Sequence, residues 1–505
     1  MLLRFTFHVL PVMNVVLIST YELGHQPFGL TSAAAWLKRA GAKVTCQDAA
    51  VQHLDKDELA EADLIGFYVP MHTAMRIAAQ FIPTIKALNP RAHVVCFGLY
   101  APMNEAYLRK LGVNTILGGE FEEGLVALYR CVEASLRSVP VGLRGALPSD
   151  EAISPIEKEI ASPTTLAIPQ RRFAVTGQPE PIIFLARQDF ILPDRHTLPH
   201  LSKYAHLIRV DGQCPRVGGY TEASRGCKHH CRHCPVVPVY GGQFRIVPNE
   251  IVIEDIEQQV ESGAGHITFG DPDFFNGPGH VIPIVEKVHQ LWPHLTYDVT
   301  IKIEHLLKYQ RWLPLLRDTG CAFVTSAVES IDAGVLEIFA KGHTRDDFLK
   351  VAALFKEVGL VLQPTFVTFN PWTTLSGYLD LMQTIAQLDL AENVAPIQWG
   401  VRLLIPAGSL LLDRAEVRSV VGEFDEAALA YRWAHLDPHV DQLCEDVLAI
   451  VKDGQDHEQT RSEIFERVWR AANSAAVACE AAGEQRALPV YSRQPVPRLS
   501  ENWFC

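Results

Sequence analysis

The sequence predicts an α/β protein with a doubly wound parallel sheet, a partial (β/α)6 barrel and a helical C-terminal segment. Two observations carry this prediction. Short β-branched runs alternate with amphipathic helical patterns over residues 13–135, and the same alternation returns over residues 208–408. A chain of 505 residues is long enough to form two or three domains with buried cores.

The composition excludes several classes of protein. Apolar residues make up 48% of the chain and charged residues 20%, which is typical of globular proteins. The net charge of −13 argues against a general nucleic-acid binder, which would need a basic surface. The sequence contains no run of eighteen apolar residues, so we expect no membrane span. Eleven cysteines, three of them clustered, predict metal chemistry in a reducing cytoplasm. Met13 is a cleaner start than Met1, because residues 1–12 lack a signal-peptide cleavage site.

The N-terminal region reads as a flavodoxin-like domain over residues 13–135. Its predicted strands follow the order that a doubly wound sheet requires. They are Asn14–Ser19, Lys43–Asp48, Leu64–Tyr68, His93–Gly98 and Asn114–Gly118. A proline-rich stretch over residues 136–207 then predicts a connector with little core of its own.

The barrel prediction rests on six strand-then-helix units over residues 208–408. The six strands are Gly219–Ala223, His266–Gly270, Tyr297–Ile303, Ala322–Glu329, Val361–Thr368 and Ile397–Ile405. In barrels of this kind, ligands bind at the carboxyl ends of the strands. The polar residues that follow each strand are therefore the candidates for the site.

The segment SRGCKHHCRHCP follows the first barrel strand and contains Cys227, Cys231 and Cys234. Three thiolates so close in sequence can face one metal centre, and a [4Fe–4S] cluster fits that demand. The next cysteine is Cys321, so one iron would remain open for a substrate or cofactor. The alternatives are a zinc ion with a fourth ligand from His229, His230 or His233, or three thiols without a metal.

The spacing CxxxCxxC at the end of a first barrel strand resembles the radical SAM superfamily. The resemblance implies that the open iron binds the amino and carboxylate groups of S-adenosylmethionine (SAM). An electron from the cluster then breaks a carbon–sulfur bond. It also implies a small-molecule substrate and an electron donor such as flavodoxin or ferredoxin.

The same resemblance suggests roles for residues at the later strand ends. It implies that Gly270, Asp271 and Asp273 in FGDPDFF contact the SAM amino group. Glu329 and Ser330, followed by Lys341-Gly342, match elements that contact the methionine part of SAM.

Three further strand-end residues are candidates from their chemistry. Glu304, beside Lys302, is a ribose or substrate contact or else half of a structural ion pair. Trp372, after Asn370, floors the adenine or substrate pocket or belongs to the core. Arg402 lies in an apolar run and suits bidentate binding of the SAM carboxylate.

The N-terminal domain resembles the cobalamin-binding domains that often precede a radical SAM barrel. Those domains carry DxHxxG, in which the histidine binds cobalt. The equivalent loop here, YELGHQPFG, has His25 but no preceding aspartate, and three residues separate His25 from Gly29. Cobalamin remains open, and we favour a domain that kept the shape and serves as a lid or dock.

The C-terminal part is predicted to be helical over residues 409–485, around YRWAHLDP, with a proline-rich tail over residues 486–505. The tail ends at Cys505, and apolar residues beside this thiol suggest that it tucks into the active site. The chain resembles the CUAEP/CCAEP-tail radical SAM proteins up to this cysteine. This resemblance suggests a selenoprotein truncated at a selenocysteine codon and makes Cys505 a candidate catalytic residue.

The sequence thus favours a radical SAM enzyme that cleaves SAM reductively and starts radical chemistry on an unidentified substrate. A rival reaction transfers a 3-amino-3-carboxypropyl group from SAM to a soft acceptor near the C-terminal thiol. A non-catalytic scaffold that binds zinc is the alternative from another class.

Overall fold

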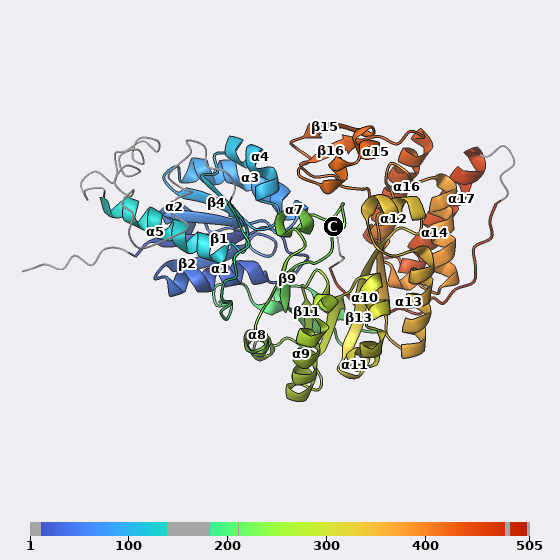
Figure 1. Ribbon diagram of the computed structural model, residues 1–505, viewed down its shortest axis with the longest axis horizontal. Helices are drawn as coiled ribbons and strands as arrows, with labels where there is room; N and C mark the ends of the chain where they lie inside the picture. The colour runs from blue at the N-terminus through green and yellow to red at the C-terminus, as the bar shows by residue number, and fades with distance from the viewer. Residues whose placement is uncertain (1–11, 139–181, 211, 480–484, 502–505) are drawn as a thin grey trace, which may run out of the picture. The chain divides into compact units, whose positions relative to one another are not determined.

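The computed structural model describes residues 12–138, 182–210, 212–479 and 485–501. The chain divides into two compact units (Figure 1). The first comprises residues 1–22 and 27–199, and the second comprises residues 23–26 and 200–505. Within the described ranges, every helix is too short or too polar to cross a membrane.

The first unit is built on a six-stranded sheet in which all neighbouring strands are parallel. The strands are β1 (Asn14–Ser19), β2 (Lys43–Asp48), β3 (Leu64–Tyr68), β4 (His93–Phe97), β5 (Thr115–Gly119) and β6 (Ile182–Phe184). Their order is β2-β1-β3-β4-β5-β6. Because the direction of winding reverses between β1 and β3, the sheet is doubly wound, as predicted.

Helices follow the strands of this sheet (Figure 1). Their buried apolar residues recur at helical spacing. They are α1 (Phe28–Arg39), α2 (Lys56–Glu61), α3 (His72–Leu88), α4 (Glu105–Lys110) and α5 (Glu122–Ser138). In α1, for example, Leu30, Ala33 and Leu37 are buried. They join a core that includes Leu17 and Leu117 of the sheet.

The described part of the predicted connector belongs to the first unit. β6 pairs with β5 and extends the sheet, and Lys38 forms an ion pair of 2.8 Å with Asp194. The backbone N–H of Cys46 also donates a hydrogen bond of 2.9 Å to the Thr197 hydroxyl. These contacts place residues 182–199 in the first unit, which differs from the predicted connector over residues 136–207.

The second unit is built on a curled seven-stranded sheet of order β14-β13-β12-β11-β8-β7-β17. Five neighbouring strands are parallel: β8 (Arg216–Thr221), β11 (His266–Phe269), β12 (Thr296–Thr300), β13 (Cys321–Glu329) and β14 (Leu362–Phe366). The helices that follow them include α8 (Asn249–Glu261), α9 (Pro278–Leu291), α10 (Ile303–Lys308), α11 (Leu313–Asp318), α12 (Ala333–Phe339), α13 (Arg345–Val358) and α14 (Leu375–Gln387). This arrangement confirms the prediction of a partial barrel.

The predicted sixth barrel strand over Ile397–Ile405 is wrong. Residues Pro396–Gly400 form a 3₁₀ helix, and only an isolated bridge pairs Phe369 with Arg402. At this edge of the sheet a side-chain hydrogen bond takes the place of strand pairing. The Gln398 side chain accepts a hydrogen bond of 2.9 Å from the backbone N–H of Phe366 in β14. An apolar run can therefore lie beside a sheet edge without becoming a strand.

The C-terminal part was predicted to be helical, but the structure shows that it also contains a hairpin. Strands β15 (Val421–Asp425) and β16 (Ala430–Trp433) pair antiparallel, between α15 (Ala415–Arg418) and α16 (Pro438–Asp456). Tyr431 and Trp433 pack on an apolar cluster, while Arg432 is exposed, which is the alternation of a strand. Helix α17 (Arg461–Cys479) follows.

The tail also pairs with the sheet of the second unit. Its strand β17 (Arg498–Leu499) pairs antiparallel with β7 (His206–Ile208), which pairs with β8. The side chain of Gln363, in β14 at the other edge of the sheet, donates a hydrogen bond of 2.7 Å to the Pro497 carbonyl. The tail thus connects the two edges of the curled sheet.

Candidate functional site

The cysteine segment is a loop held by a small hairpin. Strand β9 (Ser224–Gly226) pairs antiparallel with β10 (Phe244–Ile246), and α7 (Val236–Tyr240) follows the loop. Gly226 has a φ of +74°, and a Cβ there would lie 2.5 Å from the Gln243 carbonyl oxygen. Only glycine fits this entry to the loop.

The three thiols lie in one buried environment. Cys227 and Cys231 are buried, Cys234 is half-buried, and all three are free. Burial raises the pKa of Cys227 and raises that of Cys234 to about 12, and the charges of neighbouring thiolates add to both rises. Such thiols stay protonated at neutral pH until a metal replaces the proton.

Side chains of the loop anchor it to neighbouring strand ends. Lys228 Nζ donates a hydrogen bond of 2.8 Å to the Asn276 carbonyl, beyond β11. Arg232 Nη1 donates to the carbonyls of Glu337 and Ile338 in the last turn of α12, where a cation is favoured. These hydrogen bonds hold the loop against the neighbouring strand ends.

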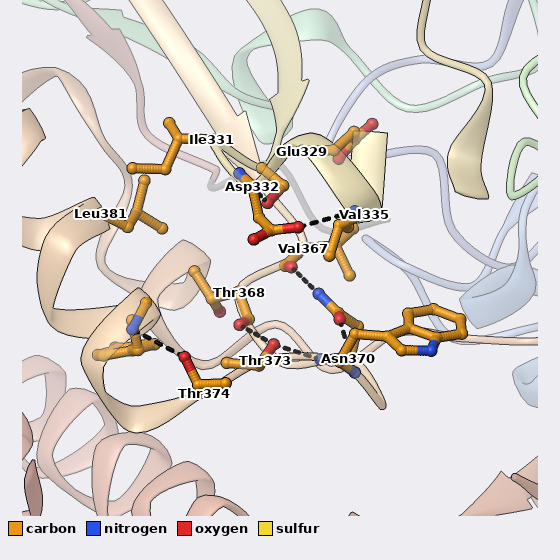
Figure 2. Close-up of a pocket in the computed structure, with 14 residues that line it drawn as sticks. Glu329, Ile331, Asp332, Val335, Val367, Thr368, Asn370, Thr373, Thr374 and Leu381 are labelled. Carbon is orange, nitrogen blue, oxygen red and sulfur yellow. Dashed lines mark hydrogen bonds between the residues drawn. The ribbon is translucent and has the colours of Figure 1, made fainter. Parts of the chain in front are cut away.

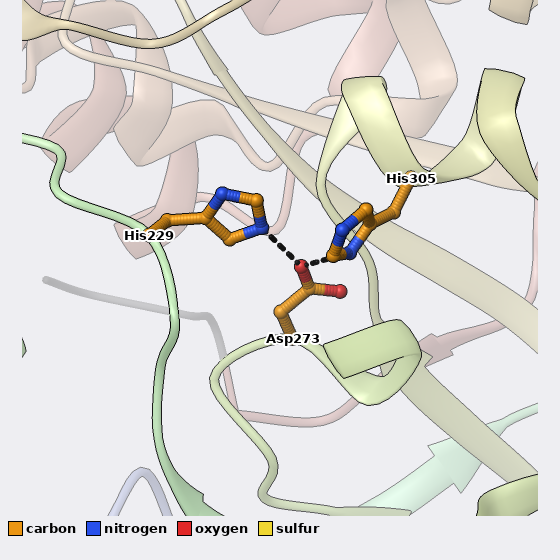
Figure 3. Close-up of side chains that lie close together, drawn as sticks. All are labelled: His229, Asp273 and His305. Atoms are coloured by element: carbon orange, nitrogen blue, oxygen red, sulfur yellow. Dashed lines mark hydrogen bonds and ion pairs between the residues drawn. The ribbon is translucent and has the colours of Figure 1, made fainter. Parts of the chain in front are cut away.

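His229 extends into a cluster with Asp273 and His305 (Figure 3). His229 Nε2 lies 3.1 Å from Asp273 Oδ2, and His305 Nδ1 lies 2.6 Å from the same oxygen. The other oxygen, Asp273 Oδ1, accepts a hydrogen bond of 3.1 Å from the Phe275 N–H. Both carboxylate oxygens of Asp273 therefore already have partners, so little hydrogen-bonding capacity remains for a SAM amino group.

The turn after β11 holds the other two residues predicted there. Asp271 accepts hydrogen bonds from the Ala223 N–H (2.9 Å) and the Ser224 hydroxyl (2.5 Å), and burial raises its pKa to about 7. Gly270 packs so closely on Tyr220 that a Cβ would overlap the tyrosine hydroxyl. Asp271 thus fastens the strand that leads into the cysteine loop.

Lys302 and Glu304 lie beyond the third barrel strand, which ends at Thr300, and Glu304 lies in the first turn of helix α10. Lys302 Nζ lies 3.3 Å from Glu304 Oε2 and 3.2 Å from His229 Nδ1. Glu304 is half exposed, whereas Lys302 is buried. The predicted Lys–Glu pair is present, and it also reaches the cysteine loop.

Glu329 is buried between His233 and Lys341. Its Oε1 lies 3.1 Å from His233 Nε2 and 3.4 Å from Lys341 Nζ. Burial raises the pKa of Glu329, but Lys341 and His233 more than offset this effect and lower the pKa to about 2. Glu329 therefore stays ionised, and it joins the fourth strand end to the cysteine loop.

A pocket opens beside Glu329 at the ends of β13 and β14 (Figure 2). It is lined by Glu329, Ser330, Asn370, Trp372 and Thr374, among others. Trp372 lines this pocket and also packs against the apolar cluster around Phe339. Two of the predicted strand ends, the fourth and the fifth, therefore share one pocket.

Arg402 lies apart from this arrangement of charges. Its guanidinium forms an ion pair of 2.7 Å with Asp441, donates to the Trp433 carbonyl and stacks on the Trp433 ring. Aromatic stacking and a carboxylate together satisfy the guanidinium. These contacts join the barrel to the hairpin and α16.

The remaining two residues singled out from the sequence are His25 and Cys505. His25 is buried in the second unit and stacks on Tyr220, with ring centroids 5.0 Å apart. Burial lowers the pKa of His25 to about 4, so it is neutral. Cys505 lies outside the described residues.

The sequence reading missed His305 and gave His229 and His233 only as zinc ligands. Their partners are carboxylates from other strand ends, which no local pattern reveals. The available signal was the density of histidines next to strand ends, as in KHHCRH and IEHL. Barrel topology brings such strand-end residues together.

Comparisons with known proteins agree with this architecture. Residues 221–371 match the model of the radical SAM superfamily. The hopanoid C-3 methylase of Methylococcus capsulatus is 24% identical over 199 residues, which cover 39% of this chain and 37% of that protein. The bacteriochlorophyllide d C-8(2)-methyltransferase of Chlorobaculum tepidum is 27% identical over 158 residues, which cover 29% of this chain and 34% of that protein. These matches span about a third of either relative.

Two solved structures share the fold over most of the chain. OxsB, a cobalamin-dependent SAM radical enzyme, gives a TM-score of 0.61 at 12% identity, covering 92% of this chain and 72% of its own. TsrM from Kitasatospora setae, a radical SAM methyltransferase, gives a TM-score of 0.59 at 17% identity. The match covers 88% of this chain and 90% of the TsrM chain. A domain of this superfamily implies a [4Fe–4S] cluster and SAM, and Cys227, Cys231 and Cys234 fit the cluster. Residues 221–371 are thus a radical SAM domain.

Proposed function

We propose that the protein binds SAM at a [4Fe–4S] cluster held by Cys227, Cys231 and Cys234, and that it cleaves SAM reductively to act on a small molecule. The observation that carries the proposal is a loop, held by hydrogen bonds to neighbouring strand ends, that contains three free thiols, two of them buried and one half-buried. Three protein ligands leave one iron of a cubane open. When bound, the cluster supplies the electron that breaks a carbon–sulfur bond of SAM.

The methionine part of SAM carries an ammonium and a carboxylate, and the mouth of the barrel offers a partner for each. We assign Glu329 to the ammonium, with Ser330 beside it in the pocket. We assign Lys341 to the carboxylate, because its ammonium is buried near Glu329 and interacts with the thiolates of Cys231 and Cys234. Lys341 suits this role better than Arg402, whose guanidinium is bound to Asp441.

Of the turn after β11, we retain only Gly270 as a SAM contact, through its backbone. The side chains of Asp271 and Asp273 already hold Ser224 and two histidines. Glu304, which is half exposed beside the buried Lys302, remains our candidate for a ribose or substrate contact. Cys505 remains a candidate catalytic thiol on sequence grounds alone.

A second candidate function is methyl transfer with cobalamin. It is favoured by the two methylating relatives and by the cobalamin named in the TsrM and OxsB structures. In that case cobalt receives no ligand from His25, because this imidazole is buried against Tyr220. Addition of cobalamin to the anaerobic protein would then give a stoichiometric absorption spectrum, and no bound cobalamin after desalting would rule this candidate out.

Product analysis tests the main proposal. The protein is reconstituted anaerobically with iron and sulfide, then incubated with SAM and dithionite, and the nucleosides are identified by mass spectrometry. We expect 5′-deoxyadenosine. S-adenosylhomocysteine that depends on added cobalamin would support methyl transfer, and methylthioadenosine would instead indicate transfer of the 3-amino-3-carboxypropyl group.

A matched pair of variants sharpens this test. Cys231→Ala removes a cluster ligand and should abolish every nucleoside product. Cys214→Ala changes an exposed cysteine outside the loop and should leave the products unchanged. A wild-type protein that holds four irons yet yields none of the nucleosides would contradict the proposal, and zinc in place of iron would favour the scaffold alternative.

A further inference from the structure

We propose that His229, Asp273 and His305 form a second metal site, which binds a divalent transition ion such as zinc or ferrous iron next to the cysteine loop. Among the described residues, these three side chains form the group of potential ligands whose donor atoms all lie within 4.8 Å of one another (Figure 3). They come from the cysteine loop, the turn after β11 and helix α10. The site needs only the fold, so it does not depend on the SAM chemistry proposed above.

Burial makes this group unusual. The side chains of His305 and Asp273 are only 2% and 3% exposed, and that of His229 is 13% exposed. Burying an ionised carboxylate is costly unless it is paired or coordinates a metal. The three residues therefore form a closed set of nitrogen and oxygen donors, unlike the exposed acidic groups common on protein surfaces.

His305 supplies the second, independent observation. Its Nδ1 lies 2.6 Å from Asp273 Oδ2, yet this nitrogen makes no hydrogen bond of acceptable geometry. Two ligands bound to one tetrahedral ion at about 2.0–2.1 Å lie about 3.3 Å apart, so a metal that replaces this contact must move the two side chains slightly apart. An ion between them would give the buried nitrogen an aligned partner in place of the direct contact with Asp273.

The donor set defines the class of ion. Two imidazoles and one carboxylate suit zinc and ferrous iron, whereas magnesium and calcium prefer oxygen ligands alone. Three protein ligands leave at least one coordination position for a small molecule, as in catalytic rather than structural sites. An ion here would offer that position to an oxygen or nitrogen donor of a bound substrate.

The surroundings of His229 set a condition on binding. For Nε2 to bind a metal, the ring proton must sit on Nδ1 and needs an acceptor. Glu304 Oε2, 3.8 Å from Nδ1, can fill that role, but Lys302 Nζ lies 3.2 Å from the same atom and competes as a donor. Metal binding must therefore move Lys302 away from His229 and draw Glu304 toward it.

This competition gives a test that separates a metal site from a plain hydrogen-bond network. The full-length protein, with its cluster already reconstituted, is titrated with zinc, desalted and analysed for zinc and iron. We expect one zinc per chain in addition to the cluster iron. His305→Ala should lose this zinc, whereas His230→Ala, a change in the same loop at a residue that packs on Gly242, should retain it.

Two neighbouring variants should shift the affinity in opposite directions. Lys302→Met removes the competing donor and should tighten zinc binding by about tenfold. Glu304→Gln weakens the acceptor for His229 and should loosen binding by about tenfold. A gain in affinity cannot arise from misfolding, so Lys302→Met keeps the test valid even if His305→Ala does not fold.

A spectroscopic measurement completes the test. In the Cys227→Ala/Cys231→Ala/Cys234→Ala variant, cobalt(II) should give visible d–d bands without thiolate charge-transfer absorption, since only nitrogen and oxygen ligands remain. Equal zinc in the wild type and in His305→Ala would overturn the proposal. Unchanged affinity in Lys302→Met, or a cobalt spectrum dominated by thiolate ligation, would overturn it as well.

Discussion

Glu329 combines an unfavourable backbone conformation with a buried charge. Its φ is +66°, which costs about 1 kcal/mol or more for a residue with a side chain, and the pairing between β13 and β14 shifts register beside it. The ion pair with Lys341 and the contact with His233 hold the side chain in place. Strain of this kind persists where the surroundings fix the residue, as they do at ligand sites.

The depressed pKa of Glu329 predicts a dependence of stability on pH. Because the pKa falls from 4.5 to about 2 on folding, the ionised form stabilises the fold above pH 4.5 by on the order of 3 kcal/mol. This contribution is lost as the pH falls from 4.5 toward 2. Glu329→Gln should therefore have a lower Tm than the wild type at pH 7, and the difference should narrow toward pH 3. A difference in Tm that is constant with pH would contradict this account.

Gly270 carries a prediction about packing. A methyl group there would overlap the Tyr220 hydroxyl, so Gly270→Ala should lower the Tm by several degrees and impair cluster assembly. Gly279→Ala is the matched control, because nothing lies within 4 Å of a Cβ at that helical position. Alanine favours helix formation, so the control should keep or raise the Tm. Equal effects of both changes, in thermal unfolding and iron analysis, would refute the packing argument.

The sequence names single candidate residues most directly where a short motif carries the chemistry. Cys227, Cys231 and Cys234 follow from spacing alone, and Glu329 from the residues beside it. Arg402 shows the limit of such reasoning. Its apolar neighbours suggested a cofactor ligand, but Asp441 and Trp433, which satisfy it, lie 39 and 31 residues away in sequence.

Among the structural elements, the cysteine loop depends on the end of α12. Arg232 donates two hydrogen bonds to the last turn of this helix, and its own N–H donates to the Phe339 carbonyl (2.9 Å). Arg232→Ala should therefore leave overall folding intact but speed the loss of iron to a chelator by about tenfold, since charge-assisted bonds each contribute about 1.5–3 kcal/mol. Arg311→Ala, at an exposed residue on another element, is the control and should release iron at the wild-type rate.

The tail is the second element with a testable role. Ser500 N–H donates to the His206 carbonyl (2.8 Å), and the His206 N–H donates to the Ser500 hydroxyl (3.0 Å). Deletion of residues 495–505 should lower the Tm by about 5 °C and promote aggregation, because it uncovers the edge of β7. Deletion of residues 502–505 alone keeps β17 and should leave the Tm unchanged. If the longer deletion unfolds at the wild-type temperature, β17 does not stabilise the sheet.

Elements with strong local periodicity were predictable, and those fixed by distant partners were not. The first five strands of the first unit match their predicted ranges closely, because buried β-branched runs between helices leave few alternatives. The prediction of a strand after Ala395 was wrong, since the Gln398 side chain occupies the hydrogen-bonding position at the sheet edge. The β15–β16 hairpin was missed because its two strands are short and its pairing is irregular.

For the molecule as a whole, the sequence predicted two α/β units and a site at the carboxyl ends of the barrel strands. The structure supports both, as the Cys227 loop, the Asp273 turn and Glu329 all lie there and contact one another. The point in the chain where the first unit ends could not be predicted from the sequence. Prolines suggested a connector, whereas Ile182–Phe184 adds a strand to the sheet through backbone pairing that composition does not reveal.

The most direct test of the central claim is the EPR spectrum of the reduced cluster with and without SAM. The full chain, reconstituted anaerobically and reduced with dithionite, should contain about four irons per chain, as the three-cysteine site requires. Saturating SAM should shift the g-values, because one iron has no protein ligand. A spectrum that SAM leaves unchanged, in protein with a full complement of iron, would show that no iron is open and would contradict the account.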